Sequence, residues 1–278
     1  MSEIGSEIRV FARRTKWTPS DDLAFYDKPP RYELPDLPVM VSVTFTWDKR
    51  RGERLRKAWL KRCRNVQIGG PAFDDPGGEF VRGRFLNRSV TITSRGCPKV
   101  CPWCSVPARE GRLRELSYIS PGWIVQDNNL LACSRAHIEA VFDMLSKGEA
   151  PASFPGGLDV TLLKNWHIEL LKRLNAKHKL AAIWVSFDTE RSLKWLHFAM
   201  DMFADLHRER RRAYVLIGYN GDSPYHAEKR LNLVYAAGFL PFAMLYRPIH
   251  GKIDWSPEWK DLQRKWTRPA AYRSKQKT

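Results

Sequence analysis

From residue 89 onward the chain alternates short apolar runs with amphipathic segments, and this alternation constrains the fold more than any other feature. The apolar runs predict strands at residues 89–94, 122–126, 152–154, 181–187, 213–218 and 240–246. Helices are predicted between them, at residues 134–147, 160–174, 190–207 and 224–237. Strands that alternate with helices form parallel sheets with right-handed crossovers, so we expect an α/β fold. Six strands are fewer than a closed eight-stranded barrel requires, which predicts a partial (β/α)6 barrel of the TIM type over residues 88–250.

Two segments precede this region. Residues 1–38 are polar and interrupted by prolines, which predicts an irregular N-terminal arm without chemistry of its own. Residues 39–45 and 65–70 are typical of strands, and the basic segment 48–63 between them is typical of a helix. We therefore expect a small βαβ extension over residues 39–87.

The positive charge of the chain is concentrated in two places. The net charge is +17, and residues 36–118 carry 17 Lys and Arg against 8 Asp and Glu. The tail, residues 251–278, carries 8 against 3. Basic clusters of this kind bind polyanions, so we expect a nucleic-acid partner, either DNA or RNA; the alternative is a basic surface without a partner.

The basic C-terminal tail is also rich in aromatic residues, namely Trp255, Trp259, Trp266 and Tyr272. Aromatic rings among cations suit stacking on unpaired bases. The alternative is that the tryptophans attach the tail to the barrel, and we expect at least two of them to do so.

We expect a cytoplasmic protein that does not enter a membrane. No stretch approaches the roughly 18–20 apolar residues of a membrane-spanning helix, and the N-terminus lacks the apolar core of a secretory signal. Five cysteines in such a chain do not indicate a disulfide framework, and three of them fall within eight residues.

These three cysteines, Cys97, Cys101 and Cys104, follow a predicted strand with the spacing C-x-x-x-C-x-x-C. Three thiolates on one loop can ligate three irons of a 4Fe-4S cluster and leave the fourth iron open. Zinc is the competing interpretation, but a structural zinc ion normally has four protein ligands, and no further Cys or His pair lies nearby at a suitable spacing.

With Trp103 just before the last cysteine, the motif resembles that of the radical S-adenosylmethionine (SAM) superfamily, and the resemblance extends over about residues 88–250. It implies a 4Fe-4S cluster and SAM as cofactors. In that family the open iron binds the amino and carboxylate groups of SAM. One-electron reduction then gives methionine and a 5′-deoxyadenosyl radical, which abstracts hydrogen from the substrate. An electron donor such as flavodoxin or ferredoxin is also implied.

The resemblance also assigns SAM-binding residues to the ends of the later strands. Asp127, Asn128 and Asn129 stand where the family usually carries Gly-Gly-Glu, a departure similar to cobalamin-dependent and methylthio-transferring members. Asp127 and Asn128 are the candidates there, and the alternative is an Asx-rich cap for the next helix. Period-two spacing places Ser186 and Asp188 on one face with Trp184, and these two polar residues are candidates for the SAM ribose or carboxylate. The remaining candidates for cofactor binding are Trp103, Gly156, Gly157, Gly218, Leu245 and Tyr246. For Gly156 and Gly157, whose bare backbone allows a ligand to approach closely, the alternative is a plain turn.

Only Cys63 and Cys133 are left outside the motif, too few for a second three-cysteine cluster. Cys133 is a candidate catalytic residue, as a hydrogen-atom donor or a site of adduct formation; the alternative is a buried structural cysteine. The βαβ extension resembles a reduced form of the cobalamin-binding domain of some relatives. A complete doubly wound domain needs several such units, so cobalamin is not expected.

Three functions are consistent with these features. The first is a radical SAM enzyme that modifies a base in DNA or RNA, a hypermodification of the kind that some viruses encode. The second is a radical SAM enzyme that acts on a small metabolite or peptide. The third is a nucleic-acid-binding iron–sulfur protein without catalysis, in which SAM does not bind.

Overall fold

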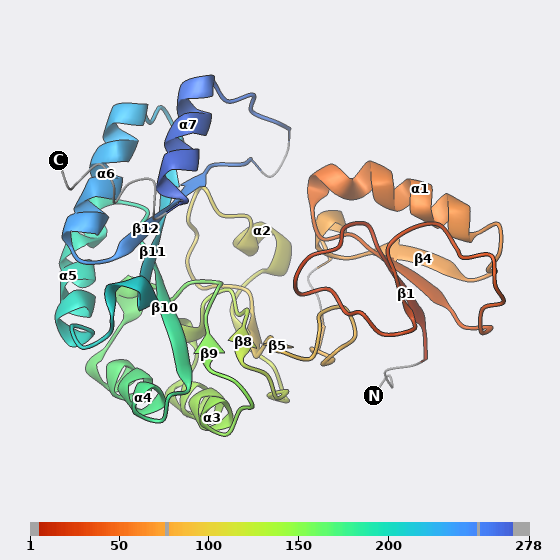
Figure 1. The fold of residues 1–278 in the computed structure, drawn as a ribbon, viewed down its shortest axis with the longest axis horizontal. Helices are drawn as coiled ribbons and strands as arrows, with labels where there is room; N and C mark the ends of the chain where they lie inside the picture. The colour runs from red at the N-terminus through yellow and green to blue at the C-terminus, as the bar shows by residue number, and fades with distance from the viewer. Residues whose placement is uncertain (1–5, 76–77, 249–250, 269–278) are drawn as a thin grey trace.

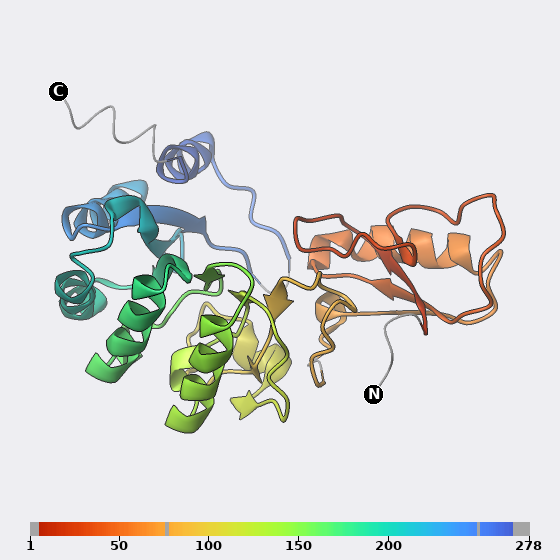
Figure 2. The same cartoon turned by 60° about the horizontal axis from the view of Figure 1, so that its bottom comes forward.

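The computed structural model describes residues 6–75, 78–248 and 251–268. The chain is an α/β protein whose two main sheets are parallel, and they form two lobes that lie side by side (Figures 1 and 2). Each lobe has its own cluster of buried apolar side chains. Among the described residues, no helix has both the length and the apolar character needed to cross a membrane.

The N-terminal lobe is a four-stranded parallel sheet in the order β2-β1-β3-β4, with one long helix, α1. Its elements are β1 (Ile8–Phe11), β2 (Ala24–Phe25), β3 (Val39–Ser42), the 3-10 turn η1 (Thr46–Asp48), α1 (Lys49–Trp59), β4 (Val66–Gly69) and the 3-10 turn η2 (Pro71–Phe73). Trp59 at the end of α1 is fully buried between the helix and the sheet. The βαβ unit expected from the sequence is thus β3, α1 and β4.

The prediction of an irregular arm over residues 1–38 was wrong for β1, which is fully buried between β2 and β3. The strand was not recognised from the sequence because a charged residue, Arg9, lies in the middle of it. The Arg9 guanidinium is buried, and its nitrogens bond the carboxylate of Asp21 and the carbonyl oxygens of Gly83 and Arg84. A buried charge is tolerated where such partners replace water.

The C-terminal lobe contains a six-stranded parallel sheet with the order β12-β11-β10-β9-β8-β5. Its strands are β5 (Val90–Thr91), β8 (Ile124–Val125), β9 (Ala152–Ser153), β10 (Leu180–Ser186), β11 (Arg211–Ile217) and β12 (Leu240–Leu245). The helices α3 (Arg135–Ser146), α4 (Asn165–Ala176), α5 (Leu193–Met202) and α6 (Pro224–Ala236) lie along its outer side (Figure 1). Each of the six predicted strands overlaps an observed one, and the predicted α/β pattern is confirmed.

The two faces of this sheet differ sharply along β10 and β11. Ile183 and Val185 of β10, and Val215 of β11, are buried beneath the helices. The alternate residues, such as Trp184 and Tyr214, are only half-buried because they line an open cavity. Successive side chains of a strand point to opposite faces, so one face forms the core and the other is free for ligands.

The tail forms a helix, α7 (Pro257–Trp266), which the sequence did not predict. Trp259, Leu262 and Trp266 are spaced three and four residues apart, and all three are buried against the body of the lobe. The Trp266 indole N–H also donates to Glu228 on α6, at 3.2 Å. Two tryptophans therefore attach the tail, as expected. Tyr272 lies outside the described residues.

Candidate functional site

The predicted site residues follow the carboxyl ends of the parallel strands, and these ends lie at one edge of the sheet. A cavity of about 1050 Å³ opens there. The predicted residues that line it are Cys97, Cys101, Trp103, Cys104, Asn128, Gly156, Gly157, Ser186 and Asp188. The carboxyl edge of an open parallel sheet is the usual position of a ligand site in α/β proteins.

The three cysteines lie on a loop whose base is tied down by a short hairpin of β6 (Ser94–Arg95) and β7 (Arg114–Glu115). Gly96 has a φ of +73°, and a Cβ there would lie 2.2 Å from the Arg112 carbonyl oxygen. The Cys97 N–H donates to the Gly111 carbonyl oxygen at 3.3 Å, which holds the start of the loop. Only glycine at position 96 allows this close approach.

Burial raises the pKa of the Cys101 and Cys104 thiols, and the neighbouring cysteines and Asp188 raise it further. Thiolates crowded together in this way repel one another, and Lys99 offsets this only in part at Cys101. A bound metal cation reverses the balance because it stabilises thiolates directly. The three thiols of the loop could therefore act together as metal ligands.

Asn129 contacts the cysteine loop directly, although the sequence assigned it no separate role. The residue is 4% exposed, and its Nδ2 lies 3.5 Å from Cys97 Sγ and 3.3 Å from Asp159 Oδ2. Asp159 in turn forms an ion pair with Lys99, at 2.6 Å. The Asn129 Oδ1 is buried and has no hydrogen-bond partner among the described residues. The sequence contained one indication that Asn129 belongs to the site, because it is part of the Asp-Asn-Asn segment that follows a predicted strand.

Asp188 is the most strongly perturbed acid of the cavity. Burial, reinforced by the charge of Asp159, raises its pKa to about 6. Hydrogen bonds from the Trp103 indole and the Leu216 backbone oppose this shift. Trp103 therefore positions a carboxylate whose pKa is close to neutral, and a polar ligand group at the cavity wall can bind to it.

Gly218, Leu245 and Tyr246 are not among the described residues that line the cavity. A Cβ on Gly218 would lie 2.7 Å from the Trp255 ring. The absence of a side chain at Gly218 therefore leaves room for Trp255, at the start of the tail. Tyr246 packs edge-on against Tyr219, with ring centroids 4.9 Å apart, and Tyr219 packs against Trp103 at 5.7 Å. Tyr246 thus supports the cysteine loop through other aromatic residues.

The cavity has an aromatic wall that the sequence did not reveal as a group. Trp184 and Tyr214 stack with ring centroids 4.6 Å apart, and Phe242 contacts both edge-on. The Tyr214 hydroxyl donates to the Pro155 carbonyl oxygen at 2.9 Å, and burial raises the pKa of this phenol to about 12. The three rings come from adjacent strands β10, β11 and β12, so only the strand order brings them together.

The N-terminal segment, to which the sequence assigned no chemistry, also reaches the cavity. Lys16 and Trp17 are among its lining residues, and the Lys16 amine lies 4.8 Å from the centre of the Trp17 ring. Lys16 is exposed and Trp17 is half-buried, and a cation next to an aromatic ring at a cavity wall can contact an anionic or planar ligand. The site is therefore built by both lobes.

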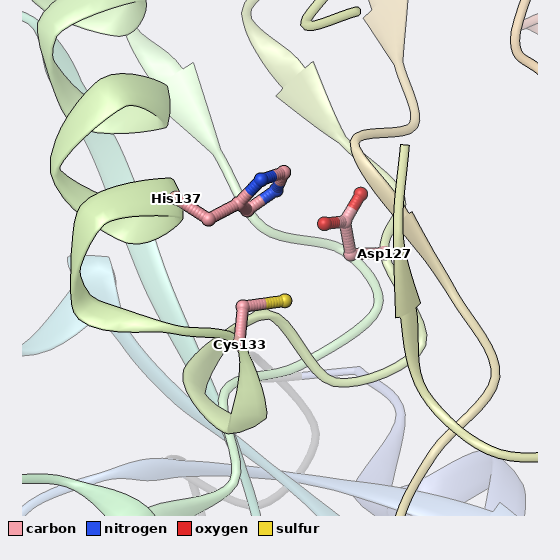
Figure 3. Close-up of side chains that lie close together, drawn as sticks. All are labelled: Asp127, Cys133 and His137. Carbon is pink, nitrogen blue, oxygen red and sulfur yellow. The ribbon is translucent and has the colours of Figure 1, made fainter. Parts of the chain in front are cut away.

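Asp127 and Cys133 do not line the cavity but point toward His137 in a buried cluster (Figure 3). The potential ligand atoms of these three residues lie within 4.8 Å of one another. The Asp127 carboxylate already accepts from the Thr93 N–H at 2.6 Å, the Thr93 hydroxyl at 2.6 Å and the Ser94 hydroxyl at 2.8 Å. The Nε2 of His137 lies 3.0 Å from the same Thr93 hydroxyl.

These hydrogen bonds account for the cluster without a metal ion. Both Asp127 oxygens are occupied, and the network joins the end of β5 to the end of β8. Burial raises the pKa of Asp127, and the hydrogen bonds from Thr93 and Ser94 oppose that rise. Burial also raises the pKa of Cys133 to about 12, so its thiol is protonated at neutral pH. The hydrogen bonds of this buried group of side chains therefore hold together the ends of β5 and β8, close to the start of the cysteine loop.

A scan against models of known protein families and a search of curated proteins each found no match. The site itself consists of the three thiols, the polar groups beside them and the cavity that they share.

Proposed function

We propose that this protein is a radical SAM enzyme built on a partial (β/α)6 barrel, with its 4Fe-4S cluster on Cys97, Cys101 and Cys104. The observation that carries the proposal is that these three thiols share one loop and face a cavity of about 1050 Å³ at the carboxyl edge of the sheet. The uninterrupted strand order and the helices along the outer side support the barrel.

The composition of the cavity wall favours an iron–sulfur cluster over zinc. A structural zinc ion takes four protein ligands, usually Cys and His. The described residues that line the cavity include no histidine and no fourth cysteine. Three thiols alone suit a four-iron cluster with one open iron.

The residues around the thiols fit a nucleoside with polar substituents. Asn128, Ser186 and Asp188 line the cavity and offer an amide, a hydroxyl and a carboxylate. Gly156 and Gly157 bring bare backbone to the wall, and the aromatic wall gives a ring system apolar surface. When bound, the cluster and SAM supply an electron and a 5′-deoxyadenosyl radical that removes hydrogen from the substrate.

We further propose that the substrate is a nucleotide in DNA or RNA. The cavity, at about 1050 Å³, is at the upper end of the range of about 300–1,000 Å³ that is usual for small-molecule sites, and it is open to solvent. The cysteine loop lies within residues 36–118, the part of the sequence that has the largest excess of positive charge. A polyanionic substrate is complementary to that charge.

An anaerobic assay tests the proposal. The protein is reconstituted with iron and sulfide and given SAM, with dithionite in place of flavodoxin or ferredoxin. 5′-Deoxyadenosine is then measured without nucleic acid and with single-stranded DNA, duplex DNA or RNA. We expect product from the wild type, stimulation by one nucleic acid, and only background from Cys101→Ala.

The matched control is Cys63→Ala, which removes a cysteine of the N-terminal lobe and should leave the product yield unchanged. An intact cluster that neither binds SAM nor yields product with any of these substrates would contradict the proposal.

A further inference from the structure

A second cavity lies beside the first and is formed by both lobes. Its volume is about 360 Å³, and we call it the Trp47 pocket. It is lined by Thr44, Phe45, Thr46, Trp47, Pro71 and Asp74 of the N-terminal lobe, by Trp103, Ser105, Ala108 and Arg109 around the cysteine loop and α2 (Val106–Glu110), and by Arg247 and Pro248 after β12. Trp103 and Ser105 line both cavities, so a ligand in the Trp47 pocket lies next to the cysteine loop.

The rim of the Trp47 pocket carries an exposed, flat aromatic surface. Trp47 is 52% exposed, and Phe45 stacks on it with ring centroids 4.7 Å apart and an interplanar angle of 10°. The guanidinium of Arg247 lies 4.8 Å from the centre of the Trp47 ring. Leaving a large aromatic side chain in water is unfavourable for folding, so such a surface is typical of a binding site.

The charges around the Trp47 pocket are mostly positive. Arg109 and Arg247 line it, and Asp74 is the one acidic residue among the described residues of its wall. Arg109 also forms an ion pair with the buried Glu110, at 2.8 Å, so Arg247 contributes the larger share of the positive charge. Helix α1 begins directly after η1 with Lys49, Arg50 and Arg51. An aromatic stack flanked by arginines and a basic helix end is complementary to a planar base with a phosphate on either side.

We propose that the Trp47 pocket binds an unpaired base of a single-stranded nucleic acid, beside the nucleotide that enters the main cavity. The base packs against the exposed part of the Trp47 ring, next to the Arg247 guanidinium, and Arg247 and Arg109 contact the adjoining phosphates. The proposal rests on the proposed function for the identity of the substrate, but it concerns binding alone. It defines the substrate as a strand that spans both cavities and not as a free nucleotide.

Binding of a fluorescein-labelled oligothymidylate of about 12 nucleotides, and of the matching oligouridylate, tests this directly. Affinity is measured by anisotropy with the anaerobic, cluster-loaded protein over a series of salt concentrations. Loss of a base stack costs at least about fivefold in affinity, so we expect Trp47→Ala to raise the Kd by about that factor or more. Arg247→Gln should reduce the slope of log Kd against log salt by about 0.7, the value for one phosphate on a single strand.

Two variants control for general effects on the surface. Tyr32→Ala removes an exposed aromatic ring at the other end of α1 from Trp47. The Tyr32 carbonyl oxygen accepts from Arg62, which follows the C-terminal end of that helix. Arg173→Gln removes an exposed charge near the C-terminal end of α4, which precedes β10 and so lies away from the carboxyl edge. Both should bind the oligonucleotides with wild-type affinity and salt dependence.

The outcomes separate this proposal from the proposed function. Oligonucleotide binding that depends on Trp47 and Arg247 supports the pocket even if no SAM is cleaved. SAM cleavage by a protein that binds neither oligonucleotide, or binds them equally well without Trp47, overturns the pocket and leaves the enzyme standing. A preference for a short acidic peptide over both oligonucleotides also overturns it.

Discussion

The side-chain nitrogen of Asn129 lies 3.5 Å from the Sγ of Cys97, so an amide that follows β8 faces a thiol of the loop between β6 and β7. Hydrogen bonds to the sulfurs of an iron–sulfur cluster stabilise its reduced, more negative form and raise its potential. If the loop binds the proposed cluster, this contact is expected to raise the potential of that cluster.

Asn129→Leu removes this donor and keeps the size of the side chain. We expect the cluster still to assemble, with a midpoint potential lower by about 40 mV, the equivalent of roughly 1 kcal/mol for one electron. A redox titration followed by electron paramagnetic resonance measures the shift. Asn128→Leu is the control, because the Asn128 amide bonds Glu110 rather than a cysteine. Identical potentials in both variants would show that the amide does not act on the cluster.

Gly96→Ala should prevent the cysteine loop from closing. The new Cβ would meet the Arg112 carbonyl oxygen at 2.2 Å, in a backbone conformation with a φ of +73°. Gly221→Ala is the matched control, since Gly221 has a φ of +75° and no described atom lies within 4 Å of the place its new methyl group would take. A positive φ alone costs alanine about 1 kcal/mol. We expect the Gly96 variant to lose most of its iron on reconstitution, and comparable iron content in the two variants would contradict the steric argument.

His167 should make the protein less stable as the solution becomes acidic. It is 1% exposed, its Nδ1 accepts from the Lys164 N–H at 3.1 Å, and burial lowers its pKa to about 4. The unfolded chain binds a proton at this residue below about pH 6.5 while the folded chain does not. The free energy of unfolding should therefore fall between about pH 6.5 and pH 4, by up to about 3 kcal/mol.

Urea denaturation at a series of pH values measures this effect. His167→Gln should show a shallower loss of stability than the wild type over the same range. His226→Gln replaces an exposed histidine and should follow the wild-type curve. Parallel curves for all three proteins would rule out His167 as the source.

Cys133 should be unreactive in the folded protein. Its pKa is raised to about 12, chiefly by burial, and only the thiolate is alkylated at an appreciable rate. We expect iodoacetamide to modify Cys133 at least about a hundredfold more slowly than Cys63 in the native protein, and equally fast in guanidinium. Peptide mass spectrometry reports both sites. Rapid native labelling of Cys133 would contradict this expectation and support a catalytic role for the residue.

Predictions from the sequence were correct where a local pattern of residues determines the structure. Strand β10 alternates side chains for the core with side chains for the cavity, and this period placed Ser186 and Asp188 correctly on the cavity side. The pattern failed for β1, because buried Arg9 depends on partners at Asp21, Gly83 and Arg84, some of them more than 70 residues away.

Long-range relationships explain the remaining differences at the site. The contact of Asn129 with Cys97 depends on the pairing of β5 with β8, and the Trp47 pocket depends on how the two lobes meet. Neither follows from spacing along the chain. Helix α7 was missed for a different reason: its basic residues suggested a nucleic-acid tail, although Trp259, Leu262 and Trp266 already had helical spacing.

The unequal faces of β10 and β11 also bear on how this protein can be changed. Residues such as Ile183 and Val215 are packed beneath helices, where loss of a side chain leaves a cavity and destabilises the fold. Trp184, Tyr214 and Phe242 border open space, so smaller side chains there enlarge the cavity without emptying the core. Substitutions at these three positions, natural or made in the laboratory, can therefore change which ligands fit the cavity while the scaffold stays intact.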